Sequence, residues 1–470
     1  MTSIFVSSSS SSFAITHFTG GDGSSSNPYL IKTAEQLYAM RNEPDAHYAL
    51  ISDIDVSELI GTQENPNPLF NNGLGWLPIG SGDTPFSGFL DGRGYAITGL
   101  YSYAPKEYEH EVQFGLFGVI DQAFLYNFDV EAHIIFESSQ RVVGGVLAHT
   151  ALNSTISGIK TNGSITSRSS NYGIIGGLLG RIANSAISNV DGNVSVNVYT
   201  QGHVGGLLGS TSYSTITNVI NRGDIHAKNK DYTGGIIGYG LENSLHYLQN
   251  NGTITSHGVV GGILGGGENV ILHTSINRGN VFTEGTIAGA IVGELGYSLN
   301  DTSLTEVSLK MLINKGDVIS THDQTSSSIG LIGKLHFNHS QRHALFYVND
   351  LINMSSTSPI LVGTIQDRSQ TFEIHVVYSG IRATLSEISF DAYSPLSGFI
   401  QVVNHSDSFD VNHLDNLVSE MNRRGLDLVA ENKDNSLKVH FAQLYYFTQG
   451  KLLEEINQNL FNINTSIMLV

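Results

Sequence analysis

A short glycine phrase recurs along this chain, and its spacing restricts the folds that the chain can adopt. Successive copies are about 27 to 32 residues apart, and the last copy follows after about 40 residues. A repeat of this length is typical of a solenoid, in which each unit buries its apolar face only against its neighbours. The copies are Gly115-Leu116-Phe117-Gly118, Gly145-Val146-Leu147, Gly177-Leu178-Leu179-Gly180, Gly206-Leu207-Leu208-Gly209, Gly235-Ile236-Ile237-Gly238 and Gly262-Ile263-Leu264-Gly265, with fainter ones at Ala290-Ile291-Val292-Gly293 and Gly330-Leu331-Ile332-Gly333.

Each repeat contains two further parts that predict strands. A segment of alternating polar and apolar residues follows the glycine phrase, and a glycine turn then leads into a third short segment. Three short strands in about 28 residues describe one coil of a parallel β-helix. Glycine at the corners permits either a positive φ or a close approach between neighbouring segments. The turns are Asn162-Gly163, Asp191-Gly192, Arg222-Gly223, Asn251-Gly252, Arg278-Gly279 and Lys315-Gly316.

Two other repeat folds fit this sequence less well. A β-propeller blade needs about 40 to 45 residues, and a leucine-rich horseshoe needs a Leu-x-x-Leu-x-Leu ladder that is missing. We therefore expect an all-β chain with a parallel β-helix over about residues 45–366, whose repeating Leu, Ile and Val side chains point inward. Valine at Gly206 or Gly235 should destabilise the rod more than valine at Gly252, because the paired glycines are expected in a tighter bend.

The segments outside the repeats predict a cap at each end of the β-helix. A short helix is expected at 34–41, because Thr33 is a suitable N-cap. Helices are also expected at 411–424 and 451–460, which makes the C-terminal segment α+β. We divide the chain into a flexible leader (1–20), an N-terminal cap with the first coils (21–111), the glycine-repeat β-helix (112–366) and a C-terminal α+β cap or assembly domain (367–470).

Composition excludes several classes of partner and site. The net charge is −19, with 42 acidic against 23 basic residues, so the surface repels phosphate backbones and anionic membranes. No run approaches the ~20 apolar residues that span a bilayer. We therefore expect no nucleic-acid partner and no membrane insertion. The chain has no cysteine, which excludes disulfides and thiolate ligands. Residues 1–13 lack a basic residue and an apolar run, so no conventional signal peptide is predicted.

The repeats resemble the GLUG motif of bacterial surface and secreted proteins, which has a Gly-Leu-Leu-Gly phrase in units that end Asn-x-Gly-x-Ile/Val. The resemblance covers about residues 21–335. It implies a right-handed parallel β-helix, of the kind found on adhesins and on stalk regions of zinc metallopeptidases that cleave immunoglobulin A1. The segments that resemble the region before GLUG repeats are Pro28-Tyr29-Leu30-Ile31-Lys32-Thr33-Ala34-Glu35-Gln36-Leu37, Asp53-Ile54-Asp55-Val56, Trp76-Leu77-Pro78-Ile79-Gly80 and Phe86-Ser87-Gly88-Phe89-Leu90-Asp91-Gly92-Arg93-Gly94.

No sequence motif predicts catalysis. A zinc peptidase needs His-Glu-x-x-His, and His110-Glu111 continues without a second histidine. A β-helix polysaccharide lyase or hydrolase needs acidic residues on one face, with a basic partner or calcium. The candidate residues fit glycine turns or the polar side of a strand, and no acidic cluster recurs on consecutive coils. They are Asp53, Asp55, Asp83, Asp91 and Arg93.

Three further patterns are better explained as structural. Arg222-Gly223-Asp224 spells the tripeptide that integrins bind, but the equivalent positions of other repeats hold different residues, as expected for a corner. The segment 330–334 lacks the glycine spacing and the Ser/Thr of a phosphate loop. Several histidines recur near repeat edges at varying offsets, whereas a metal ladder would hold one offset. They are His149, His203, His246, His257 and His273.

We therefore expect a protein that is not an enzyme and has no catalytic, cofactor or metal site. Its expected role is adhesion or extracellular structure, at the bacterial cell surface or in the medium. The expected partners are a host-cell or matrix glycan or protein, or further copies of the chain through residues 367–470. Two alternatives are a carbohydrate-active β-helix (polysaccharide lyase or hydrolase) and a phage-like fibre.

Overall fold

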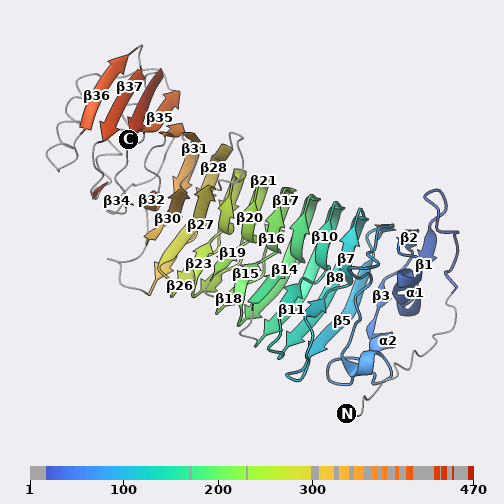
Figure 1. Ribbon diagram of the computed structural model, residues 1–470. Helices are drawn as coiled ribbons and strands as arrows, with labels where there is room; N and C mark the ends of the chain where they lie inside the picture. The colour runs from blue at the N-terminus through green and yellow to red at the C-terminus, as the bar shows by residue number, and fades with distance from the viewer. Residues whose placement is uncertain are drawn as a thin grey trace, which may run out of the picture.

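The computed structural model describes residues 17–168, 172–228, 231–297, 306–321 and 328–337, followed by separate strands between 343 and 469. The strands stack on one another along a single axis and form an elongated rod, with the N-terminal helices at one end (Figure 1). Strands of successive repeats pair in parallel, as β11 does with both β8 and β14. The predicted all-β parallel β-helix is therefore confirmed.

Two sheets run along the rod. The first sheet consists of β1 (Tyr29–Ile31), β2 (His47–Leu50), β3 (Ile54–Asp55), β4 (Phe89–Asp91), β5 (Ala96–Ala104), β8 (Phe124–Phe136), β11 (Thr155–Ser167), β14 (Ala186–Val198), β17 (Thr215–Asn221), β18 (Ile225–Ala227), β21 (Ser244–Asn250), β22 (Ile254–Ser256), β25 (Ile271–Asn277), β26 (Val281–Thr283), β28 (Glu306–Asn314), β29 (Val318–Ser320), β31 (His343–Asn353), β33 (Glu373–Val377), β35 (Phe399–His405), β36 (Leu428–Lys433), β37 (Ser436–Phe441) and β39 (Asn464–Leu469). The second sheet consists of β6 (Val112–Phe114), β7 (Phe117–Asp121), β9 (Val142–Gly144), β10 (Ala148–Leu152), β12 (Tyr172–Gly176), β13 (Leu179–Ala183), β15 (Gln201–Gly205), β16 (Leu208–Ser212), β19 (Tyr232–Gly234), β20 (Ile237–Leu241), β23 (Val259–Gly261), β24 (Leu264–Glu268), β27 (Ile287–Tyr297), β30 (Ser328–Phe337), β32 (Val362–Asp367), β34 (Glu387–Phe390) and β38 (Phe447–Thr448).

The parallel stack is longer than the predicted span of 45–366. It begins at β1, which pairs in parallel with β2. It continues beyond residue 366, because β33 pairs in parallel with β31 and β35 with β33. Antiparallel pairs follow, between β35 and β39 and between β36 and β37. The helices expected at 411–424 and 451–460 lie outside the described residues.

The predicted N-terminal helix is present at the end of the rod. It comprises α1 (Ala34–Ala39) and a 3-10 turn η1 (Met40–Asn42). Thr33 is its N-cap, since the Thr33 hydroxyl accepts a hydrogen bond of 3.4 Å from the Gln36 amide. Leu37 and Met40 are fully buried in the core, so the helix packs onto the first coils. A second short helix, α2 (Ser57–Ile60), and a 3-10 turn, η2 (Asn71–Gly73), follow before β4.

The apolar residues of the glycine phrase form the core, as predicted. Both central residues of each phrase are buried, from Leu116 and Phe117 to Leu331 and Ile332. One column of register partners reads Leu179, Leu208, Ile237 and Leu264. Like side chains therefore stack on like side chains because the period of the sequence matches the coil.

The glycines of the phrase permit close approach and, in most coils, have no positive φ. A Cβ atom at Gly206 would overlap the carbonyl oxygen of Gly235 in the next coil. In the repeats, positive φ angles occur instead at two further positions, which form two columns along the rod and hold mostly residues other than glycine. The two columns are Gln122, Asn153, Asn184, Tyr213, Glu242 and Asn269, and Asn127, Gly158, Asn189, Asn218, Tyr247 and Thr274.

Two of the predicted glycine turns are wrong. The strands β11 and β14 run through Asn162-Gly163 and Asp191-Gly192 without a break.

A column of buried asparagines holds four successive coils together at the glycine turns. The side chain of Asn250 donates from Nδ2 to Asn277 Oδ1 at 2.9 Å and to the Gly252 carbonyl at 2.9 Å. Its Oδ1 accepts from the Gly252 amide at 3.2 Å and from Asn221 Nδ2 at 2.9 Å. Asn221, Asn277 and Asn314 continue this pattern, and all four side chains are fully buried. Every polar atom of Asn250 is thus used inside the rod.

Candidate binding surface

The acidic residues that the sequence singled out stabilise local backbone. Asp53 Oδ1 accepts from the Ala96 amide, and Asp55 Oδ1 from the Ser57 amide, both at 2.9 Å. Asp91 Oδ1 accepts from the Arg93 amide at 2.9 Å. Asp55 and Asp91 thus cap turns, Asp53 connects to the start of β5, and Asp83 lies in an exposed loop. Within the described ranges, no three His, Asp or Glu side chains are grouped so that they could hold a metal ion.

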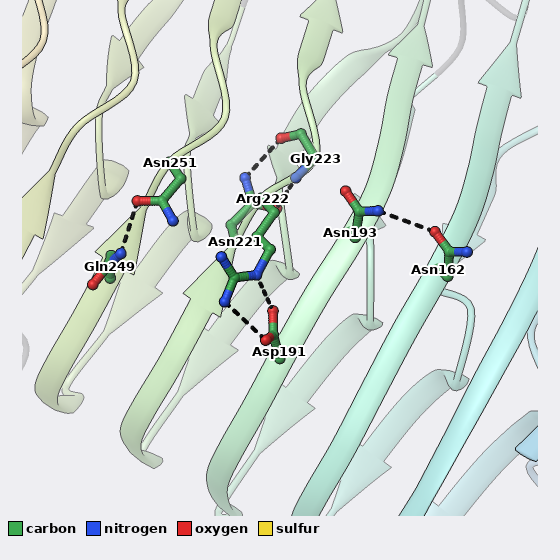
Figure 2. A network of polar contacts seen from close by, with 8 residues as sticks. All are labelled: Asn162, Asp191, Asn193, Asn221, Arg222, Gly223, Gln249 and Asn251. Atoms are coloured by element: carbon green, nitrogen blue, oxygen red, sulfur yellow. Dashed lines mark hydrogen bonds and ion pairs between the residues drawn. The ribbon is translucent and has the colours of Figure 1, made fainter.

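The Arg222-Gly223-Asp224 tripeptide is tied to the coils on both sides, and Figure 2 shows its contact with Asp191 of the preceding coil. The Arg222 guanidinium donates to both carboxylate oxygens of Asp191 in the preceding coil, at 2.7 and 3.0 Å. Asp224 Oδ1 accepts from the Thr253 amide of the following coil at 2.8 Å. The geometry agrees with the interpretation of this tripeptide as a structural corner.

The structure brings together histidines that appear scattered in the sequence. His246 and His273 are register partners on β21 and β25, and their ring centroids are 5.2 Å apart. These two therefore share one offset, contrary to the expectation that offsets vary. His257 Nδ1 lies 3.2 Å from Glu284 Oε2. His149 and His203 lie on the second sheet, at a corner where aromatic and ionisable side chains gather.

This corner is formed by the glycine phrases themselves. A Cβ atom at Gly238 on β20 would lie 2.7 Å from the backbone nitrogen of Val204 on β15, so the two strands meet backbone to backbone. Side chains that precede and follow the phrase consequently converge on the outer surface. The imidazole of His203 stacks on the ring of Tyr239, with centroids 4.9 Å apart and planes inclined by 23°.

Contacts at this corner continue from coil to coil. We call this surface the corner strip and define it as Glu111, Arg141, His149, Tyr172, Arg181, His203, Tyr232, Tyr239, Glu268, Glu294 and Lys334. One of its columns, which includes Arg181, Tyr239, Glu294 and Lys334, follows the second glycine of each phrase. The facing column includes His203 and Tyr232, three residues before the phrase.

The N-terminal half of the corner strip is arranged around Glu111. Its carboxylate lies 3.4 Å from His149 Nε2 and 3.6 Å from Arg141 Nη1. The Arg141 guanidinium lies 5.6 Å from the ring centroid of Tyr172. The Tyr172 ring in turn lies 6.0 Å from the imidazole of His203. Glu111 belongs to the only His-Glu pair of the sequence, and in the structure its carboxylate contacts the Arg141 guanidinium and the His149 imidazole of the next coil.

The C-terminal half links aromatic rings to carboxylates. The rings of Tyr232 and Tyr239 are 5.1 Å apart, and Gly266 leaves room for the Tyr232 ring, which a Cβ atom there would overlap. The Tyr232 hydroxyl donates to Glu294 Oε2 at 3.3 Å. Glu294 Oε1 lies 3.0 Å from Lys334 Nζ. Contacts from Glu111 to Lys334 thus form a chain along the outside of the rod.

Burial sets the protonation states along the corner strip. It lowers the pKa of His203 to about 4, with a smaller contribution from the charge of Arg181. It also lowers the pKa of His149 and raises the pKa of Tyr232 and Tyr239. At neutral pH both imidazoles are therefore uncharged and both phenols protonated. His203 Nδ1 is buried and has no hydrogen-bond partner in the described part of the chain.

The fold defines this chain as a parallel β-solenoid, and no family model matches it. A stretch of 134 residues is 34% identical to a "Putative Gly-rich membrane protein" of Evansella cellulosilytica, covering 27% of this chain and 14% of that protein. A stretch of 172 residues is 30% identical to "Halomucin" of Haloquadratum walsbyi, covering 35% of this chain and 2% of that protein. The chain thus spans only a small part of the curated relatives that it matches.

One solved structure is similar over much of the chain. It is described as a "putative immunoglobulin A1 protease from Bacteroides ovatus", with 19% identity and a TM-score of 0.35, covering 68% of this chain and 86% of that one. Among the described residues of the present chain, helices long and apolar enough to cross a membrane are absent.

Proposed function

We propose that this protein is a cell-surface or secreted β-solenoid that acts by binding, as an adhesin or an extracellular structural component, and is not an enzyme. The observation that carries the proposal is the corner strip, a chain of aromatic and ionisable contacts on a rigid parallel stack. Tyr and Arg side chains are enriched at recognition surfaces, and strands hold them more precisely than loops do. The two sequence relatives are described as a membrane protein and a halomucin, which supports an extracellular location.

The partners follow from the same reasoning. The rod offers a long outer surface to a host-cell or matrix glycan or protein, and residues 367–470 are the segment proposed for self-association. The resemblance of the repeats to the GLUG motif supports the adhesive role. With a net charge of −19, the chain as a whole favours partners other than nucleic acid.

Binding without turnover is the expected result when the full-length protein meets a panel of acidic polysaccharides, neutral polysaccharides and matrix proteins. Retention on the immobilised ligands measures binding, and new reducing ends or unsaturated sugars in solution measure turnover. We expect saturable retention on at least one ligand class and no product that increases with time. Product release from any polysaccharide, or no retention on any member of the panel, would contradict the proposal.

A carbohydrate-active enzyme is the second candidate, and one feature of the corner strip favours it. His203 is uncharged at neutral pH because burial lowers its pKa, and a neutral imidazole can accept a proton. The Arg181 guanidinium lies on the neighbouring column, where it could neutralise a uronate carboxylate. The intact protein would then release unsaturated sugars from a polysaccharide, and His203→Gln would lose this activity. The control is His226→Gln, at an exposed position, which would keep it. This combination of results would favour the enzyme over the binding protein.

A further inference from the structure

We propose that Arg181 and its neighbours on the corner strip bind an anionic group, a carboxylate or a sulfate ester, on a polysaccharide chain that lies along the rod. The inference rests on the proposed function and deepens it by naming the ligand class and the residues. It is carried by three features of the described structure: a cation without a counter-ion, an open tyrosine ring beside it, and the repeat of the coils.

Arg181 is a half-buried cation that has no counter-ion among the described residues. It lies on β13, and no carboxylate of the described residues is within ion-pair distance of its guanidinium. The other cations of the corner strip are paired, Arg141 with Glu111 at 3.6 Å and Lys334 with Glu294 at 3.0 Å. A guanidinium presents a planar fork of donors that fits a carboxylate or a sulfate with two parallel hydrogen bonds. Arg181 is therefore available to an anion from outside the chain.

The charge around Arg181 differs from that of the whole molecule. The net charge of −19 repels acidic polymers, so an acidic ligand needs a local positive site. Desolvation and the charge of Asp231 raise the pKa of the Tyr172 phenol, and the charges of Arg141 and Arg181 lower it, so both guanidinium groups and one carboxylate lie near this ring. Arg141 is paired with Glu111, and the imidazoles of His149 and His203 are neutral at neutral pH. Arg181 is therefore the group of this surface that can attract an anionic group of a polymer.

Tyr172 provides the surface on which a sugar ring can stack. Its side chain is 40% exposed, although desolvation raises the pKa of its phenol. Its ring is followed along the rod by His203 at 6.0 Å, and His203 by Tyr239 at 4.9 Å. Coils repeat about every 4.8 Å, which is comparable to the length of one sugar unit in an extended chain. A polysaccharide lying along the rod can therefore keep its register with the coils.

The test compares two variants that remove the same charge. Arg181→Gln changes the corner strip, and Arg278→Gln changes an exposed arginine at a glycine turn of the first sheet. The full-length proteins are titrated with polygalacturonate, which carries carboxylates, with dextran sulfate, and with neutral dextran. We expect Arg181→Gln to weaken binding to one or both charged polymers by about tenfold, Arg278→Gln to change it less than about twofold, and neutral dextran to bind none of the proteins.

Each other outcome has a defined meaning. No binding of either charged polymer by the intact protein, or equal weakening in both variants, overturns the inference. Binding to neutral dextran or to matrix proteins that Arg181→Gln leaves unchanged overturns it too, yet leaves the proposed function standing. Product release would overturn the proposed function, whereas the difference between the two variants would still support this site. If Arg181→Gln fails to fold, Arg181→Lys keeps the charge, loses the two-pronged hydrogen bond, and is expected to weaken binding to an intermediate degree.

Discussion

Replacement of Asn250 by alanine is expected to lower the free energy of unfolding by about 4 kcal/mol, because it removes four buried hydrogen bonds, at about 1 kcal/mol each, from the groups that the Asn250 side chain contacts. The groups are the amide and carbonyl of Gly252, Asn221 Nδ2 and Asn277 Oδ1. Chemical denaturation of the full-length protein, followed by circular dichroism, measures the loss.

The control for this prediction is an asparagine ladder on the outside of the same rod. Asn193 Nδ2 donates to Asn162 Oδ1 at 3.2 Å, but both side chains are exposed (Figure 2). Asn193→Ala is expected to cost about 0.5 kcal/mol or less, since water replaces the lost partner. Equal losses in Asn250→Ala and Asn193→Ala would show that the buried column does not hold the coils together.

Valine at Gly206 is expected to prevent stable folding of the coils around it. Its Cβ atom would overlap the Gly235 carbonyl oxygen and lie 2.6 Å from Asn221 Nδ2, so two coils would have to separate. Separation breaks the backbone hydrogen bonds of that corner and opens the core, which costs more than about 4 kcal/mol. Expression in soluble form and the thermal unfolding midpoint are the measurements. Gly82→Val is the control, because nothing lies within 4 Å of a Cβ atom at Gly82.

The structure gives no reason to expect that valine at Gly206 destabilises the rod more than valine at Gly252. A Cβ atom at Gly252 would overlap the carbonyl oxygen of Gly223, just as one at Gly206 would overlap that of Gly235. Neither glycine has a positive φ. We therefore expect Gly252→Val to be about as damaging as Gly206→Val, and a much milder effect at Gly252 would contradict this geometry.

The coil architecture was predictable because stacking is periodic. When one period is kept, residues at equal positions become register partners, as Leu179, Leu208 and Ile237 do. The positive-φ corners were harder to predict, since Tyr213 and Glu242 occupy positions for which glycine or asparagine is the usual signal. At these positions the backbone amide donates to the next coil, from Tyr213 to the Leu241 carbonyl and from Glu242 to the Glu268 carbonyl, which holds the backbone while the side chain varies.

The corner strip was missed for a different reason. Six of its residues come from two positions of the repeat: His203 and Tyr232 lie three residues before the phrase, and Arg181, Tyr239, Glu294 and Lys334 follow it. The residue type at each position changes from coil to coil, and the other five residues lie at further positions. Their contact depends on the angle between two strands, which the sequence does not encode in any single position. Alignment of the repeats on the glycine phrase would have placed Arg181, Tyr239, Glu294 and Lys334 in one column, and this mixture of aromatic and charged residues was the available signal.

We propose the outer corner of the glycine repeats as the binding surface of this rod. A crystal structure of the full-length protein with a short oligogalacturonate tests this proposal most directly. We expect the sugar chain to lie along the corner strip, with one carboxylate on the Arg181 guanidinium and a sugar ring on Tyr172. An oligosaccharide bound to the first sheet, or only to residues beyond 366, would contradict it.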